Sequence, residues 1–76
     1  MKDLIEFIVK ALVDDADAVE INMEYKDNVE VYKVKAAKED IGKIIGKQGK
    51  NIKALRTLVK SISAREGKRT ALEIEE

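Results

Sequence analysis

The residues with the clearest chemical potential lie in one stretch, residues 41–52, which contains two glycines three positions apart. Gly46 and Gly49 enclose Lys47 and a glutamine, and Lys50 follows directly. Glycine has no Cβ, so it adopts positive φ and lets the backbone of a flat ligand approach to contact distance. The loop amides, the N-terminus of a helix after the loop and the two lysines would all present positive charge. This chemistry suits a polyanion such as a sugar-phosphate chain.

The charge distribution supports this interpretation, although the chain is neutral overall, with 15 basic and 15 acidic residues. Residues 41–65 contain bases and no acid. These bases are Lys43, Lys47, Lys50, Lys53, Arg56, Lys60 and Arg65. Because salt screens charges beyond about 10 Å, a ligand at the loop would feel mainly this local patch. A solvated helix face that is simply basic is the alternative interpretation.

Residue content excludes most catalytic functions. The chain has no cysteine and no histidine, so it offers no thiol nucleophile, disulfide, imidazole base or usual zinc site. Gly42 and Gly46 are one position too close for a Walker A motif, and Gln48 stands where Ser or Thr would bind Mg²⁺. The acidic segment 14–17 is expected to be a solvated turn rather than a metal site. We therefore expect no catalytic residue, metal, cofactor or small-molecule substrate.

Chain length and N-terminal composition indicate the class of protein. The 76 residues suffice for one domain, residues 1–76, and for no second one. Lys2, Asp3 and Glu6 interrupt the first apolar residues, unlike a signal peptide or a transmembrane span. The absence of cysteine fits a reducing compartment. We expect a soluble cytoplasmic protein without a membrane partner.

The segments before the loop are predicted to form a helix and a β-hairpin. Apolar residues at i, i+4 spacing favour an amphipathic helix over residues 1–13. Strict alternation over residues 19–25 predicts a strand that turns and returns over residues 29–36. The returning strand breaks the alternation, which predicts a bulge or two partly apolar faces. Tyr25 and Tyr32 are both expected in the core rather than as stacking platforms for bases.

The remaining segments are predicted to be two helices and a strand. A short helix opens at Lys38, and Gly42 within it costs up to about 1 kcal/mol relative to alanine, which close approach of a ligand or of the neighbouring helix would explain. A second helix covers about residues 50–64, Gly67 ends it, and residues 70–74 alternate as a strand. This order predicts an α+β domain whose three helices cover one face of a three-stranded mixed sheet, with the second and third strands parallel.

With these elements in place, the sequence resembles a KH domain, an RNA-binding module with an Ile-Ile-Gly-x-x-Gly-x-x-Ile core. Residues 44–52 match that core throughout. A helix and hairpin before the motif and one strand after it resemble the bacterial type II order, α-β-β-α-α-β. Because one such domain uses the whole chain, it is similar to the small single-KH proteins of the KhpA (YlqC-like) family. Lys38 departs from the family, which has proline there; this loosens the start of the helix but touches no binding residue.

The resemblance implies a groove that holds about four unpaired nucleotides of single-stranded RNA. The glycine loop would clamp the RNA backbone, and its two variable residues would contact phosphate or sugar. Ile41, Ile45 and Ile52, with Val34 from the sheet, would form an apolar floor beneath the bases. The expected RNA-binding residues are Val34, Ile41, Gly42, Lys43, Ile45, Gly46, Lys47, Gln48, Gly49, Lys50, Ile52, Lys53 and Arg56.

Partners are expected because four nucleotides held without aromatic stacking should bind weakly, so that useful affinity needs avidity. The resemblance implies a homodimer and also pairing with a larger KH-containing partner, KhpB (Jag-like). Independently, the stripe of five aliphatic residues on helix 50–64 is expected to exceed what a three-stranded sheet covers, which leaves apolar surface for a partner.

Three functional hypotheses follow, in order. The first is a non-catalytic RNA-binding module, acting as an RNA chaperone or post-transcriptional regulator. The second is a protein-interaction subunit whose KH fold serves mainly for dimerisation, with RNA binding secondary. The intact Gly-Lys-Gln-Gly loop argues against the second, which an acidic loop would have favoured. An enzyme ranks a distant third.

Overall fold

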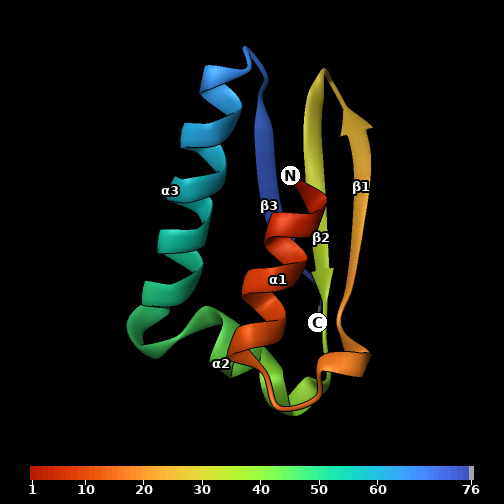
Figure 1. Cartoon of the computed structure of the whole chain (residues 1–76), viewed down its shortest axis with the longest axis vertical. Coiled ribbons are helices and arrows are strands. Elements are labelled where there is room, and N and C mark those ends of the chain that lie inside the picture. Colours follow the sequence, from red (N-terminus) through yellow and green to blue (C-terminus); the bar gives the residue numbers. More distant parts are fainter. Residues whose placement is uncertain (76) are drawn as a thin grey trace.

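The computed structural model describes residues 1–75. Its helices and strands are α1 (Lys2–Leu12), β1 (Glu20–Lys26), β2 (Val29–Lys35), α2 (Ile41–Ile45), α3 (Lys50–Arg65) and β3 (Thr70–Ile74). Short 3₁₀ turns lie in the connections: η1 (Ala16–Ala18), η2 (Lys38–Asp40) and η3 (Lys47–Gly49). The α-helices all lie on one side of the sheet, with α1 in front of it and α3 along the side of β3 (Figure 1). The predicted α+β fold of type II order is confirmed.

The sheet has the strand order β1-β2-β3. Strands β1 and β2 are antiparallel, and the two residues between them, Asp27 and Asn28, have φ of 53° and 67°. Two consecutive positive φ values define the type I′ turn, whose twist matches that of the flanking strands. Strands β2 and β3 are parallel, from Glu30 opposite Thr70 to Val34 opposite Ile74. The crossover through α2 and α3 therefore joins parallel strands, as predicted.

Strand β2 has no bulge, because its register with β1 runs unbroken from one end to the other. Instead, both of its faces are largely buried: Tyr32 and Val34 face the helices, and Val31 on the opposite face is only 6% exposed. The core assignment was right for Tyr32 and wrong for Tyr25, which is 70% exposed. Tyr25 lies near the hairpin end of the edge strand β1, beyond the reach of α1 (Figure 1).

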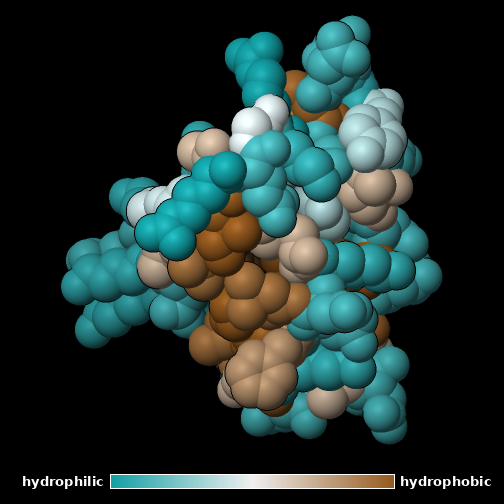
Figure 2. All heavy atoms as spheres, turned by 45° about the horizontal axis from the view of Figure 1, so that its top comes forward, coloured by the Kyte–Doolittle hydropathy of each residue, from teal (hydrophilic) through white to brown (hydrophobic). Residues whose placement is uncertain are grey.

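The helices bury one stripe each and leave apolar residues between them uncovered. Helix α1 buries Ile5 and Val9, and α3 buries Ile52, Leu55 and Val59. Apolar side chains nevertheless gather in a continuous patch on the face that carries α1 and α3 (Figure 2). We call this the α1–α3 apolar patch; it includes Ile8, Leu12, Ala54 and Leu58, and Phe7 is a further exposed apolar residue on α1. Within residues 1–75, no helix has the length and apolar character needed to cross a bilayer.

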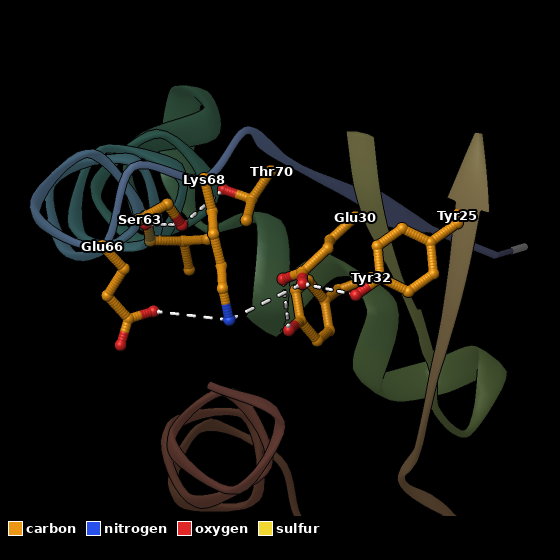
Figure 3. A network of polar contacts seen from close by, with 8 residues as sticks. Tyr25, Glu30, Tyr32, Ser63, Glu66, Lys68 and Thr70 are labelled. Atoms are coloured by element: carbon orange, nitrogen blue, oxygen red, sulfur yellow. Dashed lines mark hydrogen bonds and ion pairs between the residues drawn. The ribbon is translucent and has the colours of Figure 1, made fainter. Parts of the chain in front are cut away.

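A buried carboxylate lies between the hairpin and the end of α3. Glu30, on the helix side of β2, is 7% exposed. It accepts hydrogen bonds from the hydroxyls of Tyr25 at 2.9 Å and Tyr32 at 3.2 Å, and the Lys68 ammonium lies 3.9 Å away (Figure 3). Burial and the nearby carboxylate raise the pKa of Tyr32, and the hydrogen bond to Glu30 raises that of Tyr25. This network was not predicted from the sequence, because a glutamate in a strand is usually solvated.

Candidate functional site

The glycine loop between α2 and α3 has a backbone that ordinary residues adopt only with strain. Gly46 has φ 79° and ψ 170°, Gln48 has φ 59°, and Gly49 has φ 74°. A Cβ on Gly46 would lie 2.6 Å from the Asn51 side chain and 2.8 Å from the Asn51 backbone nitrogen. A Cβ on Gly49 would approach nothing closer than the Lys53 side chain at 3.9 Å. Gly46 is therefore required for both space and conformation, and Gly49 for conformation alone.

Asn51 fixes the loop from its C-terminal side. Its side-chain amide donates a 2.9 Å hydrogen bond to the backbone carbonyl of Lys43, which links the first turn of α3 to α2 across Gly46. Asn51 was not among the site residues expected from the sequence. The available signal was its position two residues after Gly49, where a short amide side chain can satisfy the free carbonyls at the end of a preceding helix.

The loop presents hydrogen-bond donors to solvent. Gly46 N–H bonds to the Gly42 carbonyl at 2.9 Å and Gly49 N–H to the Gly46 carbonyl at 3.0 Å. The amides of Lys47 and Gln48 have no acceptor within residues 1–75, and both side chains are exposed. Two adjacent free amides beside an ammonium group form a ready site for one phosphate.

Most of the predicted cations on α3 are available to a ligand. Lys50, Lys53 and Arg56 are exposed, and like Lys47 they make no ion pair within the described chain. Arg56 donates from Nε to the carbonyl of Leu72 on β3 at 3.3 Å. This bond holds the guanidinium between α3 and β3.

Lys43 differs from the other cations because two carboxylates already hold it. Its ammonium contacts Asp14 and lies 3.4 Å from Asp40. The hydrogen bond to Asp14 is the main cause that raises the pKa of Lys43. Asp40 also accepts the backbone N–H of Asp15 at 3.0 Å, and this bond is the main cause that lowers the pKa of its carboxyl. The acidic segment after α1, expected to be merely solvated, therefore anchors the start of α2.

A hollow of about 570 Å³ lies where β2 and β3 end and α2 begins. Its lining residues are Lys35, Ala36, Lys38, Ile41 and Glu75. Ile41 is half-exposed there, and Ile45 is half-exposed farther along α2, as an apolar floor requires. Neither Lys35 nor Lys38 was among the RNA-binding residues expected from the sequence.

Three other predicted residues lie differently from expectation. Val34 has no exposed surface, so it can only support the floor from beneath, and Ile52 is 7% exposed. Gly42 is exposed, and a Cβ there would meet nothing within 4 Å. Close approach of the neighbouring helix therefore does not account for Gly42.

Three strands, three helices on one face and a Gly-x-x-Gly loop joining the second and third helices define a type II KH domain. The family model described as KhpA/KhpB, KH domain, matches residues 2–74, and the chain belongs to that family.

Curated relatives match over nearly the whole chain. The RNA-binding protein KhpA of Caldanaerobacter subterraneus subsp. tengcongensis is 47% identical over 97% of this chain and 99% of its own length. That of Chlamydia trachomatis is 45% identical over 100% of this chain and 97% of its own. That of Listeria monocytogenes is 46% identical over 97% of each. No solved structure gives a significant match.

Proposed function

We propose that this protein is a non-catalytic RNA-binding protein that holds about four nucleotides of single-stranded RNA along the glycine loop. The observation that carries the proposal is the loop backbone, in which three of the residues 46–49 have positive φ and the amides of Lys47 and Gln48 remain free. The relatives' name, RNA-binding protein KhpA, supports the same ligand. Its cellular role is that of a cytoplasmic RNA chaperone or post-transcriptional regulator.

Phosphate and sugar are bound at the loop, and bases on the apolar side of α2. The free amides with the Lys47 ammonium and the Gln48 side chain contact the RNA backbone. Ile41 and Ile45 offer half-exposed apolar surface to the bases. Lys50, Lys53 and Arg56 attract the strand electrostatically, whereas Lys43 contributes less because Asp14 and Asp40 hold it.

Two copies of the chain pair through the α1–α3 apolar patch. Phe7 is 73% and Leu58 41% exposed, and the patch is hollowed between Ile8, Leu12 and Ala54. Arg56, which reaches towards β3, lies on the opposite flank of α3, so pairing through the patch leaves the groove open. Two weak sites on one dimer raise the overall affinity through effective concentration. The same patch suits a larger KhpB (Jag-like) partner.

The test is fluorescence anisotropy of a labelled random-sequence single-stranded RNA titrated with three proteins. These are the wild type, the loop variant Lys47→Asp/Gln48→Asp and the control Lys2→Asp/Asn22→Asp, which changes the charge equally at exposed positions away from the loop. Aspartate tolerates the positive φ of position 48 better than most residues, so the loop variant should fold. Binding by wild type and control with loss in the loop variant is expected. Equal binding by all three folded proteins would refute the loop assignment.

The exposed apolar patch also favours a second candidate, a protein-interaction subunit in which RNA binding is secondary. The same experiment separates the two functions. If neither the wild type nor the variants bind RNA while all remain dimers by sedimentation, the interaction function is supported and the RNA-binding function is refuted.

A further inference from the structure

A second group of cations lies at the far end of α3 from the glycine loop. Lys60, Lys68 and Arg69 line a hollow of about 340 Å³ together with Val29, Ser63 and Thr70. Its lining contains three basic side chains and no carboxylate. Helix α3 has 16 residues and so is about 24 Å long, which separates this hollow from the loop by several nucleotides. Figure 1 shows the loop and the turn after α3 at opposite ends of the molecule.

One flank of α3 connects the loop to this hollow. Lys53, Arg56 and Lys60 are spaced by three and four residues, which places them on one face of the helix. Two contacts show that this flank borders β3: Arg56 donates to the Leu72 carbonyl at 3.3 Å, and the hydroxyls of Ser63 and Thr70 lie 2.9 Å apart. A strand leaving the loop along this flank meets one cation on each turn.

The turn that carries Lys68 and Arg69 is fixed by backbone hydrogen bonds. Gly67, at φ 68°, lets the chain leave α3 in a Schellman motif, in which Lys68 N–H bonds to the Ser63 carbonyl at 2.9 Å. The Arg69 carbonyl accepts the Glu30 N–H at 2.9 Å. The contact between Ser63 and Thr70 closes the same corner (Figure 3). The cations therefore start from an ordered backbone, which lowers the entropic cost of binding.

The three cations differ in how much charge they offer. Lys68 lies 3.9 Å from Glu30 and 4.0 Å from Glu66, so part of its charge is already balanced. Lys60 and Arg69 make no ion pair within residues 1–75 and are exposed. A guanidinium and an ammonium that face one hollow provide a fork and a point charge for a phosphate group.

We propose that the hollow formed by Lys60, Ser63, Lys68, Arg69 and Thr70 is a second backbone-binding subsite, which takes a phosphate of the same RNA strand beyond the nucleotides held at the glycine loop. The inference rests on the proposed function and deepens it. Its consequence is a footprint longer than four nucleotides, with the added contacts made to phosphate and therefore independent of base sequence.

The experiment compares labelled random-sequence RNAs of four and of ten nucleotides by anisotropy. One ten-nucleotide RNA extends the tetranucleotide on its 5′ side only, and the other extends it on its 3′ side only. The variant is Lys60→Ala/Arg69→Ala, and the control Lys2→Ala/Arg65→Ala removes the same charge. Arg65 lies at the same end of α3 but on another flank, and only the Arg69 backbone takes part in the fold contacts above.

Wild type and control should bind one of the extended RNAs more tightly than the tetranucleotide. The variant should bind the tetranucleotide normally and keep only the part of the gain that comes from the larger number of binding registers. A longer strand also offers more registers to a short site, but this statistical gain is the same in all three proteins. With the favoured extended RNA, the variant's log-log salt slope should be shallower by about 0.7, the value for one phosphate contact on single strands.

Equal affinities and slopes for variant and control would overturn the subsite while leaving the function of the loop intact. If the wild type binds none of the RNAs, the proposed function itself is overturned, and the subsite with it. Binding of the tetranucleotide with no dependence on length would overturn the subsite alone.

Discussion

Replacement of Gly46 by alanine should be the most damaging single change in the loop. Its φ of 79° and ψ of 170° lie in a region that is essentially restricted to glycine, and another residue there costs about 1–3 kcal/mol. The new Cβ would overlap the Asn51 side chain at 2.6 Å, so Asn51 must move. Its exposed hydrogen bond to the Lys43 carbonyl is then lost, at about 0.5 kcal/mol. The free energy of unfolding is therefore expected to fall by about 1.5–3.5 kcal/mol.

Gly49→Ala is the matched control for this prediction. Its φ of 74° and ψ of 16° are left-handed helical, which costs another residue about 1–2 kcal/mol, and its Cβ has room. Because the stability losses expected for Gly46→Ala and Gly49→Ala overlap in size, the two substitutions are distinguished by their dependence on Asn51. In an Asn51→Gly background, Gly46→Ala should cost at least about 0.5 kcal/mol less than in the wild type, whereas the cost of Gly49→Ala should not change.

Urea unfolding measures these losses in the free energy of unfolding. All proteins are compared at one fixed concentration, because pairing of chains would make stability depend on concentration. Thermal unfolding gives a second measurement, in which Tm falls by about 4–8 °C for each kcal/mol lost in a domain of this size. If Gly46→Ala proves as mild as Gly49→Ala and shows no coupling to Asn51, then the packing of Asn51 across the loop does not determine the requirement for glycine.

The buried carboxylate and the anchored aspartate give three further predictions. Glu30→Leu leaves the buried Tyr32 hydroxyl without its acceptor and should destabilise the fold by about 1–3 kcal/mol in urea, and a loss within error of zero would contradict this. The pKa values of Tyr25 and Tyr32 are raised above 10.0, so the stability they contribute is present below pH 10.0 and is lost as pH rises through the raised values. If the stability of the wild type falls no more steeply above pH 10.0 than that of Tyr25→Phe/Tyr32→Phe, the two tyrosines are not the source of this loss. The pKa of Asp40 is lowered below 3.8, so its contribution is present above pH 3.8 and is lost as pH falls through the lowered value. Asp40→Asn should therefore narrow the stability difference between pH 6 and pH 2, and an unchanged difference would exclude Asp40 as its source.

The fold was predictable because its signals are local. These signals are the helical and strand periodicities of the apolar residues, the glycines at 46, 49 and 67, and the order of elements around the motif. Each of them depends on only a few neighbouring residues. Tyr25 was misassigned because its position beyond the end of α1 depends on how far a helix reaches across the sheet. Its alternation with Glu24 and Lys26 carries no such information.

The site was predictable at the loop and less so around it. Asn51 was missed because its role depends on the approach of its side chain to Gly46, which the motif itself does not state. The pairing of Lys43 with Asp14 joins residues 29 positions apart, and only the folded chain brings them together. Val34 was expected in the floor from the resemblance, which gives the position of a residue but not the depth of its side chain.

The pairing of Lys43 with Asp14 has a consequence for how RNA binding responds to salt. Salt dependence arises because a bound phosphate releases the mobile cations and anions that had gathered around the two partners. Lys43, however, carries a tethered counterion, the Asp14 carboxylate, whose side chain is 84% exposed and free to swing away. A phosphate that takes its place releases its own condensed cation, but the freed Asp14 carboxylate gathers a cation in exchange, so the net release of ions is close to zero. The salt slope of the loop site should therefore count only Lys47, Lys50, Lys53 and Arg56, at about −2.8 for single-stranded RNA. In Asp14→Asn, Lys43 keeps the Asp40 carboxylate beside it but recovers part of its ion atmosphere, and the slope should steepen towards about −3.5.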